Sequence, residues 1–253
     1  MTDAVCVVPV SPIRSLSSHK SEMVSQLLFG DVITVLEDAG YWKRIHVQYD
    51  DYEGWCTGSH LMPLKKNHQP TTPAFTGEWV NIISLNDVPM KLPFGCDISL
   101  FLNASQLDTA DNFRYDGSVM SLSQHQSFEE HVTHISNFFL NTAYLWGGRS
   151  VFGIDCSGFS QLVFKMAGKR ILRDAWQQAE QGAAIGSDIA KRGDLAFFNN
   201  EEGRVVHVGI LLDHERIIHA AGKVRIDGFS AEGILNVDSG AKTHSLSGIK
   251  RYS

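Results

Sequence analysis

Cys156 stands where the sequence could make a reactive thiol. An aromatic, glycine-rich stretch, YLWGGRSVFGID, leads to it, and apolar residues follow it at helical spacing from Phe159 to Met166. This pattern predicts that Cys156 lies at or just before the start of a helix. The unpaired N–H groups and the dipole of a helix N-terminus favour a thiolate over a thiol. The chemistry that this spacing favours is nucleophilic attack by sulfur.

Two histidines could complete a catalytic set. His207 lies in the apolar segment VVHVGILL, where a strand would turn Val206 and Val208 to the opposite side. His219 lies in the next predicted strand, beyond the turn DHE, so antiparallel pairing could bring the two rings together. A cysteine hydrolase needs a base for the thiol proton and a third group that orients the base. We therefore predict Cys156 as nucleophile, His207 as base and His219 as the acceptor of its Nδ1–H.

Spacing alone leaves an alternative open. The chain holds 11 histidines, so a cysteine and two histidines in apolar segments can also occur without any catalytic role. Catalytic triads are identified by geometry rather than by sequence position. Histidines packed into the core remain the competing interpretation of His207 and His219.

Composition excludes several classes of protein. With 253 residues, of which 43% are hydrophobic and 20% charged, the chain can bury a substantial core. A net charge of −6 argues against a nucleic-acid-binding protein. No apolar run approaches the ~18 residues of a membrane span, and the first residues lack the pattern of a secretory signal. We expect a cytoplasmic protein with no nucleic-acid, membrane or obligate protein partner.

The remaining cysteines carry no signal of chemistry. No cysteine or histidine pair has the spacing of a zinc site, so we expect no metal and no other cofactor. Disulfides are rare in a reducing cytosol. Cys6, Cys56 and Cys96 are expected to be small buried side chains in or beside strands.

The front of the chain reads as a small β-barrel. Residues 1–66 contain short apolar or alternating segments at 5–10, 32–36, 42–49 and 52–56, with turn residues between them. Residues 67–77, rich in proline and threonine, predict a linker. Residues 78–122 predict further short strands at 79–85, 87–92, 98–102 and 118–122, either a degraded second barrel or an extended connection within 67–127.

The last part, residues 128–253, predicts an α+β domain. An amphipathic helix over 128–140 begins at a capping box of Ser127 and Glu130. The cysteine helix, a short helix after residue 174 and an antiparallel meander follow. His125, His131 and His134 have no third ligand in phase, so solvated histidines are favoured over a metal site.

Five ordered segments of this part resemble the NlpC-type cysteine peptidases, bacterial hydrolases of cell-wall peptides. They are YLWGGRSVFGIDCSGFSQLVF, RDAWQQ, RGDLAFF, HVGILL and IIHAAGKV. The resemblance implies a papain-like core without metal or cofactor. The family's nucleophile, base and third polar residue match Cys156, His207 and His219.

The front of the chain resembles a bacterial SH3-like domain in SEMVSQLLFGD, WKRI and DYEGW. Together the two parts are similar to γ-D-glutamyl-L-diamino acid endopeptidases, which implies a murein peptide with a free N-terminal L-alanine as substrate, the SH3-like domain closing one end of the cleft. A buried ammonium needs anionic or hydroxyl partners, and Asp155, beside the nucleophile, is the first candidate to bind it. The residues expected to bind substrate are Asp155, Ser157, Tyr52, Glu22, Tyr144, Trp146, Arg173 and Asp174.

Each of these substrate-binding assignments has an alternative. Asp155 would also serve as a helix cap, and Arg173 with Asp174 as an ion pair that shapes a loop. Tyr52 and Glu22 could be ordinary barrel surface, and the aromatic residues Tyr144 and Trp146 could belong to the core.

The predicted activity is hydrolysis after γ-D-glutamate, in the recycling of murein peptides. An amidase or acyltransferase with the same Cys/His pair, or a non-catalytic protein that binds wall peptides, are the alternatives. The sequence does not choose between diaminopimelate and lysine at the third position of the peptide.

Overall fold

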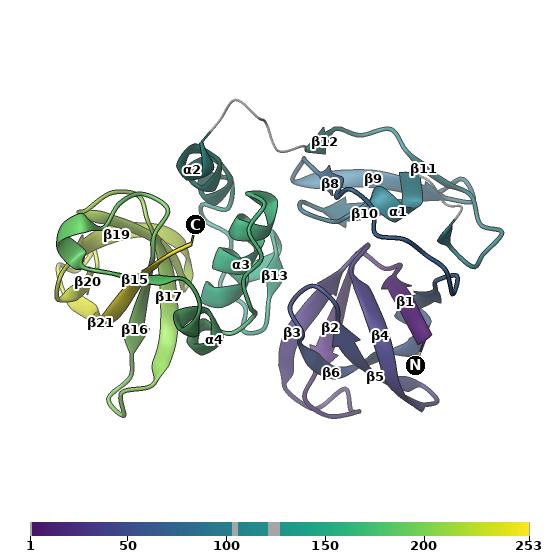
Figure 1. Cartoon of the computed structure of the whole chain (residues 1–253), viewed down its shortest axis with the longest axis horizontal. Coiled ribbons are helices and arrows are strands. Elements are labelled where there is room, and N and C mark those ends of the chain that lie inside the picture. The colour runs from purple at the N-terminus through teal and green to yellow at the C-terminus, as the bar shows by residue number, and fades with distance from the viewer. Residues whose placement is uncertain (1, 103–105, 121–126, 253) are drawn as a thin grey trace. The chain divides into compact units, whose positions relative to one another are not determined.

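The computed structural model describes residues 2–102, 106–120 and 127–252. The chain divides into two compact units (Figure 1), which are described separately. The first unit comprises residues 1–121 and 149–152, and the second comprises residues 122–148 and 153–253. The predicted domain boundaries after residues 66 and 127 stay predictions.

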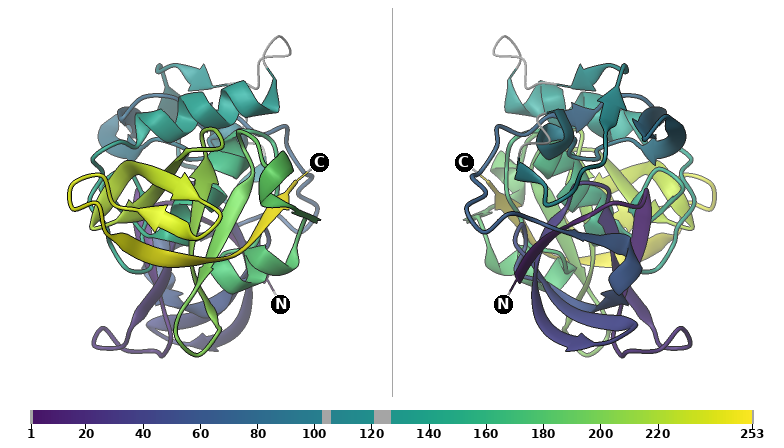
Figure 2. Two further views of the ribbon diagram at one scale, coloured as in Figure 1. Left: turned by 90° about the vertical axis from the view of Figure 1, so that its left-hand side faces the viewer. Right: turned by 90° about the vertical axis from the view of Figure 1, so that its right-hand side faces the viewer.

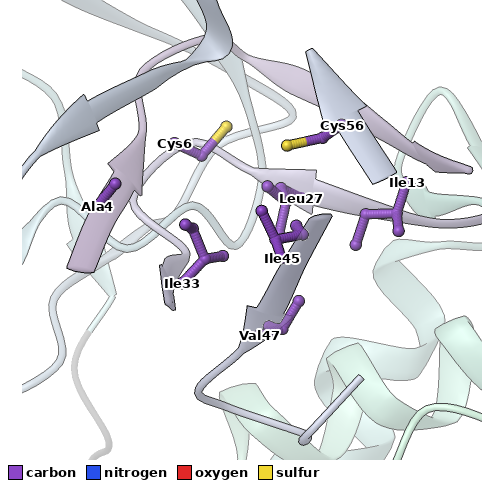
Figure 3. Close-up of a cluster of buried hydrophobic side chains, with 8 residues drawn as sticks. All are labelled: Ala4, Cys6, Ile13, Leu27, Ile33, Ile45, Val47 and Cys56. Atoms are coloured by element: carbon purple, nitrogen blue, oxygen red, sulfur yellow. The ribbon is translucent and has the colours of Figure 1, made fainter. Parts of the chain in front are cut away.

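The first unit begins with a seven-stranded antiparallel sheet in the order β3-β2-β6-β5-β4-β1-β7. Its strands are β1 (Thr2–Cys6), β2 (Val10–Arg14), β3 (Met23–Leu28), β4 (Val32–Ala39), β5 (Trp42–Val47), β6 (Glu53–Thr57) and β7 (Leu61–Pro63), with a 3₁₀ turn, η1, at Gly58–His60. Alternating side chains of these strands form one apolar core (Figure 3), as expected for strands with one buried face. The core holds Ala4, Cys6, Ile13, Leu27, Ile33, Ile45, Val47 and Cys56.

The rest of the first unit is built from short elements. They are β8 (Phe75–Thr76), β9 (Val80–Leu85), β10 (Val88–Pro93), α1 (Ser99–Leu102), β11 (Phe113–Tyr115) and β12 (Val119–Met120). The sheets are β10-β9-β11 and β12-β8. The strand predicted over 98–102 is wrong, because Asp97 caps a helical turn by accepting a hydrogen bond from the Ser99 N–H at 3.0 Å. Part of the strand predicted at 118–122 falls outside the described residues.

Residues 149–152, with β13 (Arg149–Ser150), belong to the first unit. The buried Arg149 side chain donates hydrogen bonds to the Gln26 backbone carbonyl at 2.8 Å and to Asp31 Oδ2 at 3.2 Å. The backbone N–H of Arg149 donates to Gln26 Oε1 at 2.8 Å. These bonds tie the segment to β3 and to the turn that follows it.

In residues 127–148 and 153–252, the second unit combines helices with a seven-stranded sheet, and β14 lies outside that sheet. The helices are α2 (Phe128–Phe138), α3 (Cys156–Met166) and α4 (Ala175–Glu180), with a 3₁₀ turn, η3, at Ser187–Ile189. The strands are β14 (Gly153–Ile154), β15 (Ala183–Ile185), β16 (Leu195–Asn199), β17 (Val205–Leu211), β18 (Arg216–Ala221), β19 (Lys223–Ser230), β20 (Gly233–Leu235) and β21 (Lys242–Arg251). The α+β class is confirmed.

The sheet of the second unit runs β15-β21-β16-β17-β18-β19-β20, and β20 pairs again with β21. The strands β20 and β21 are drawn in yellow in Figure 2. Because the sheet closes in this way, side chains from distant strands meet on its inner face. Helix α3, which is buried along its whole length, packs on β17 and β18. The capping box of Ser127 and Glu130 at the start of α2 is confirmed, with bonds of 2.8 and 3.2 Å.

Candidate active site

Cys156 is the first residue of α3, as the helical pattern predicts. Asp155 is the N-cap, and its Oδ1 accepts a hydrogen bond from the Gly158 N–H at 2.6 Å. The thiol takes hydrogen bonds from the N–H groups of Val208, on β17, and of Ser157. The helix start therefore delivers the sulfur to the strand that carries His207.

The environment of the thiol corrects the expectation that the helix start favours a thiolate. Cys156 is 6% exposed, and burial, followed by the charge of Asp155, raises the pKa of its thiol to about 12. The two N–H groups and Arg173 act in the opposite direction but do not outweigh burial. The helix terminus by itself does not make a thiolate at neutral pH, so the thiol needs a base that takes its proton.

His207 and His219 lie in direct contact. His207 Nε2 and His219 Nδ1 are 2.8 Å apart, and the rings meet edge to face at 81°. The predicted contact through His207 Nδ1 is wrong. His219 lies opposite Gly209 rather than opposite His207, so the contact is diagonal and uses the ring nitrogen farther from the backbone. Nδ1 is then the ring nitrogen of His207 that the contact with His219 leaves unused.

Two local features shape this contact. Gly209 has no side chain, and a Cβ there would lie 3.0 Å from the His219 Cβ, so glycine leaves room for the His219 ring to lean across. Val206 is an extra residue in the pairing of β17 with β16, and such a bulge re-aims the side chain beside it. Burial, with the charges of His219 and of His244, lowers the pKa of His207 well below its usual value.

Sequence reasoning missed two members of this site. His219 Nε2 lies 3.0 Å from Asp227 Oδ2, and both side chains are 1% exposed. The His244 ring stacks on His207 at 4.3 Å and 26°. Asp227 could have been suspected as an acidic residue that follows Val224 and Ile226 at strand spacing. His244 had no local signal, because β21 reaches the site only through sheet closure. We call Cys156, His207, His219, Asp227 and His244 the polar cluster.

Asp155 is held by a dense set of donors. Arg173, buried like Asp155, donates to both carboxylate oxygens, at 2.6 and 3.1 Å, and the Gly147 N–H donates at 2.9 Å. Arg173 also donates to Ser157 Oγ at 2.9 Å. The capping alternative for Asp155 is confirmed, and binding of a substrate amine by this carboxylate stays a prediction.

The other predicted substrate-binding residues are spread over both units. Tyr144 is half-buried, and burial, then the charges of Cys156 and Asp155, raise the pKa of its hydroxyl. Trp146 is 61% exposed, so it is not a core residue. The Asp174 N–H donates to Gln177 Oε1 at 3.0 Å at the start of α4. In the first unit Glu22 is exposed and Tyr52 packs on the barrel core.

Of the three histidines weighed as metal ligands, the structure describes His131 and His134. His134 is exposed and His131 is partly buried on α2, while His125 lies outside the described residues. Across residues 2–102, 106–120 and 127–252, no group of three or more His, Cys, Asp or Glu side chains is arranged to hold a metal ion.

Comparisons with known proteins cover most of the chain. The model of the NlpC/P60 family matches residues 141–241, and that of the bacterial dipeptidyl-peptidase Sh3 domain matches residues 13–61. Proteins named gamma-D-glutamyl-L-lysine dipeptidyl-peptidase are similar to this chain. The one from Bacillus subtilis is 30% identical over 78% of this chain and 71% of its own length. The one from Bacillus cereus is 32% identical over 90% and 77%.

A solved structure shares the fold over nearly the whole length. It is the crystal structure of an NlpC/P60 family protein from Bacillus cereus, with a TM-score of 0.78, 18% sequence identity and 99% of both chains covered.

Proposed function

Because the chain belongs to the NlpC/P60 family and is a cysteine peptidase, we propose that it hydrolyses the bond between γ-D-glutamate and the diamino acid of murein peptides. The observation that carries the proposal is that the strand bearing His207, which is hydrogen-bonded to His219, also supplies the Val208 N–H bonded to the Cys156 thiol at the start of α3. The names of the two Bacillus relatives support the same bond.

In the proposed reaction Cys156 passes its proton to His207 Nδ1 as the sulfur attacks the γ-carbonyl carbon of D-glutamate. The tetrahedral oxyanion collapses, the amide C–N bond breaks, and His207 returns the proton to the leaving amine. Water then attacks the thioester with His207 again as base, and the γ-carboxyl group of D-glutamate is released while the thiol reforms.

The oxyanion needs preorganised donors. The Cys156 N–H at the start of α3 is one candidate. Tyr144 is the second, since it lies close enough to Cys156 and Asp155 for their charges to act on its hydroxyl, which is protonated and able to donate at neutral pH.

The finer specificity is part of the proposal. We expect a free N-terminal L-alanine amine to be required, with Asp155, Glu22 and Tyr52 as the groups that recognise it. Ser157, Trp146, Arg173 and Asp174 would lie around the rest of the substrate. A murein peptide has that free amine only after its release from the sugar, so the requirement favours recycling in the cytoplasm over cleavage of the intact wall. No helix in the part of the chain that the structure describes is long and apolar enough to span a bilayer.

The test uses two synthetic peptides, L-Ala-γ-D-Glu-L-Lys and L-Ala-γ-D-Glu-meso-diaminopimelate. Mass spectrometry should detect release of L-Ala-γ-D-Glu from at least one of them, and the ratio of kcat/KM settles the preferred diamino acid. No release from either peptide by folded, reduced protein would contradict the proposed bond. Release of a different fragment would favour the amidase alternative.

A matched pair of substrates tests the amine requirement. Acetylation of the L-alanine amine removes its charge and adds bulk while leaving the scissile bond unchanged. We expect kcat/KM to fall at least about 100-fold, because an interaction with a charged group is lost and an acyl group must fit in its place. Equal rates on the two forms would remove the amine requirement and leave the peptidase assignment in place.

A further inference from the structure

Asp227 lies behind His219, on the side away from His207, and both of its carboxylate oxygens make hydrogen bonds. Its Oδ2 lies 3.0 Å from His219 Nε2. Its Oδ1 accepts hydrogen bonds from the Val237 N–H at 3.0 Å and from Arg225 Nη2 at 2.9 Å. Arg225 in turn forms an ion pair with Asp238 at 2.7 Å. A buried carboxylate with this set of donors is held in one orientation.

The charge of Asp227 follows from these contacts. Burial by itself would raise the pKa of its carboxyl, but the Val237 N–H, His219 and Arg225 together bring the pKa below its usual value. Asp227 is therefore ionised at neutral pH, and an ionised carboxylate only accepts hydrogen bonds. His219 Nε2 must consequently carry the proton in the contact with Oδ2.

We propose that Asp227 sets the tautomers of both histidines, His219 directly and His207 through it, so that His207 presents an unprotonated Nδ1 to Cys156. The inference deepens the proposed function, because it rests on His207 as the base. Asp227 acts as a positioning residue, since it reaches the reacting atoms only through two rings.

The tautomers follow one from another along the hydrogen bonds. Neutral His219 with its proton on Nε2 has a lone pair on Nδ1. The 2.8 Å contact then requires His207 Nε2 to donate. Neutral His207 with its proton on Nε2 has its lone pair on Nδ1, the nitrogen that the contact with His219 leaves for the thiol. When His207 takes the thiol proton, both of its nitrogens donate and His219 still accepts, so no second proton needs to move.

An amide in place of the Asp227 carboxylate would reverse the direction of the hydrogen bonds to His219 and from there to His207. Oδ1 of Asp227 faces two donors, the Val237 N–H and Arg225. The oxygen of an asparagine would take that position, because an NH₂ group there would point at both donors. The NH₂ group would then face His219 Nε2 and favour a proton on Nδ1 of His219. His207 would have to accept at Nε2 and carry its proton on Nδ1, which blocks the base.

The direct test is ¹⁵N NMR of the full chain with labelled histidines and no substrate, with the His219 signals assigned from the spectrum of His219→Gln. Protonated and unprotonated ring nitrogens have well-separated ¹⁵N shifts, so each tautomer is read directly. We expect His207 and His219 both protonated on Nε2 in the wild type and both shifted toward Nδ1 in Asp227→Asn. A wild-type His207 protonated on Nδ1, or unchanged tautomers in Asp227→Asn, would overturn the proposal.

Kinetics give a second, independent readout. We expect kcat of Asp227→Asn to fall by up to about 10⁴-fold, the loss seen when an asparagine holds the base of a Ser-His-Asp triad in the wrong tautomer. Asp227→Ala removes the acceptor but places no donor against His219, so it should lose less activity than Asp227→Asn. If Asp227 only supported the fold, alanine would be the more harmful change, and that order would contradict the inference.

Asp238→Asn is the matched control. It makes the same acid-to-amide change on the exposed partner of Arg225 and leaves the contact of Asp227 with His219 unaltered. We expect wild-type tautomers and kcat within about twofold of the wild type, as for most surface substitutions. The NMR readout needs no turnover, so a wild-type protein that cleaves neither peptide would refute the proposed function while leaving the tautomer test intact.

Discussion

The apolar core of the barrel and the polar cluster of the second unit each bury a cysteine. Cys56 lies among aliphatic side chains such as Ile13, Leu27 and Ile45 (Figure 3), and burial raises the pKa of its thiol to about 12. The pKa of the Cys156 thiol is raised to about 12 by the same cause. Burial and thiol acidity therefore do not distinguish the two cysteines.

The two environments differ in what surrounds the sulfur. Cys156 takes hydrogen bonds from two backbone N–H groups, and the strand that supplies one of them carries His207. The other residues of the barrel core that holds Cys56 are aliphatic, apart from a second thiol, Cys6. A buried thiol becomes a nucleophile where a base shares its desolvated site, because proton transfer within the site does not require a stable thiolate.

The largest expected effect comes from exchanging each cysteine for alanine. Cys156→Ala should lower kcat by on the order of 10⁴-fold or more, because no covalent intermediate can form. Cys56→Ala should leave kcat within about twofold and lower the free energy of unfolding by about 1–2 kcal/mol through the lost packing. Peptide hydrolysis and guanidinium unfolding measure the two quantities. Equal losses of activity would end the distinction between the two cysteines.

The next effect concerns the buried ion pair beside the nucleophile. Asp155→Asn leaves the Arg173 guanidinium buried without its counter-charge, and we expect a loss of about 3–5 kcal/mol of stability. Asp38→Asn, which breaks an exposed pair with Lys43 on the barrel, should leave the Tm unchanged.

The kinetics of the same variant separate two roles of Asp155. If this carboxylate also binds the substrate amine, KM for free-amine peptides should rise more than KM for acetylated ones. A loss of stability with parallel changes in KM would leave Asp155 as a helix cap alone.

Acid should destabilise the second unit more than the first. Burial lowers the pKa of three histidines in the second unit, His207, His219 and His244. In the first unit burial lowers the pKa of His60. Below pH ~6.5 these histidines bind protons in the unfolded chain but not in the folded protein. The free energy of unfolding therefore falls as the pH is lowered, until the folded-state pKa of each ring is reached. His207 and His219 should each contribute a slope of up to about 1.4 kcal/mol per pH unit.

Hydrogen exchange followed from pH 7.5 to 5 measures this difference by unit. Protection of β17 and β18 should fall earlier than protection of β4 and β5. Simultaneous loss, or earlier loss in the barrel, would contradict the assignment of neutral buried rings to the polar cluster.

The smallest effect is expected from the ring stacked on the base. His244→Ala removes the stack on His207 and should lower kcat/KM by about 3–10-fold, whereas His244→Phe should retain most of the activity. The control is His19→Ala, because His19 packs on Trp42 at 4.8 Å in the first unit, and activity should not change. A larger loss in His244→Phe than in His244→Ala would indicate a polar role for His244.

Local patterns predicted the elements that carry the site. The capping box of Ser127 and Glu130 and the helix start at Cys156 depend on residues within a few positions of each other, and both are confirmed. The error at 98–102 has a local cause as well, since one hydrogen bond to Asp97 turned an apolar segment into a helical turn. Short apolar runs fit either structure, so such a bond decides between them.

The sequence by itself determined which residues could do chemistry and in which elements they lie, because periodicity and capping act within one or two turns of the chain. Only the tertiary structure decided which nitrogen of His207 meets His219, that Asp227 lies behind them and that His244 covers the base. Those contacts depend on strand register, on the bulge at Val206 and on closure of the sheet between β20 and β21. Side chains far apart in the chain meet only when the whole sheet has formed, and no local pattern records which of them will face one another.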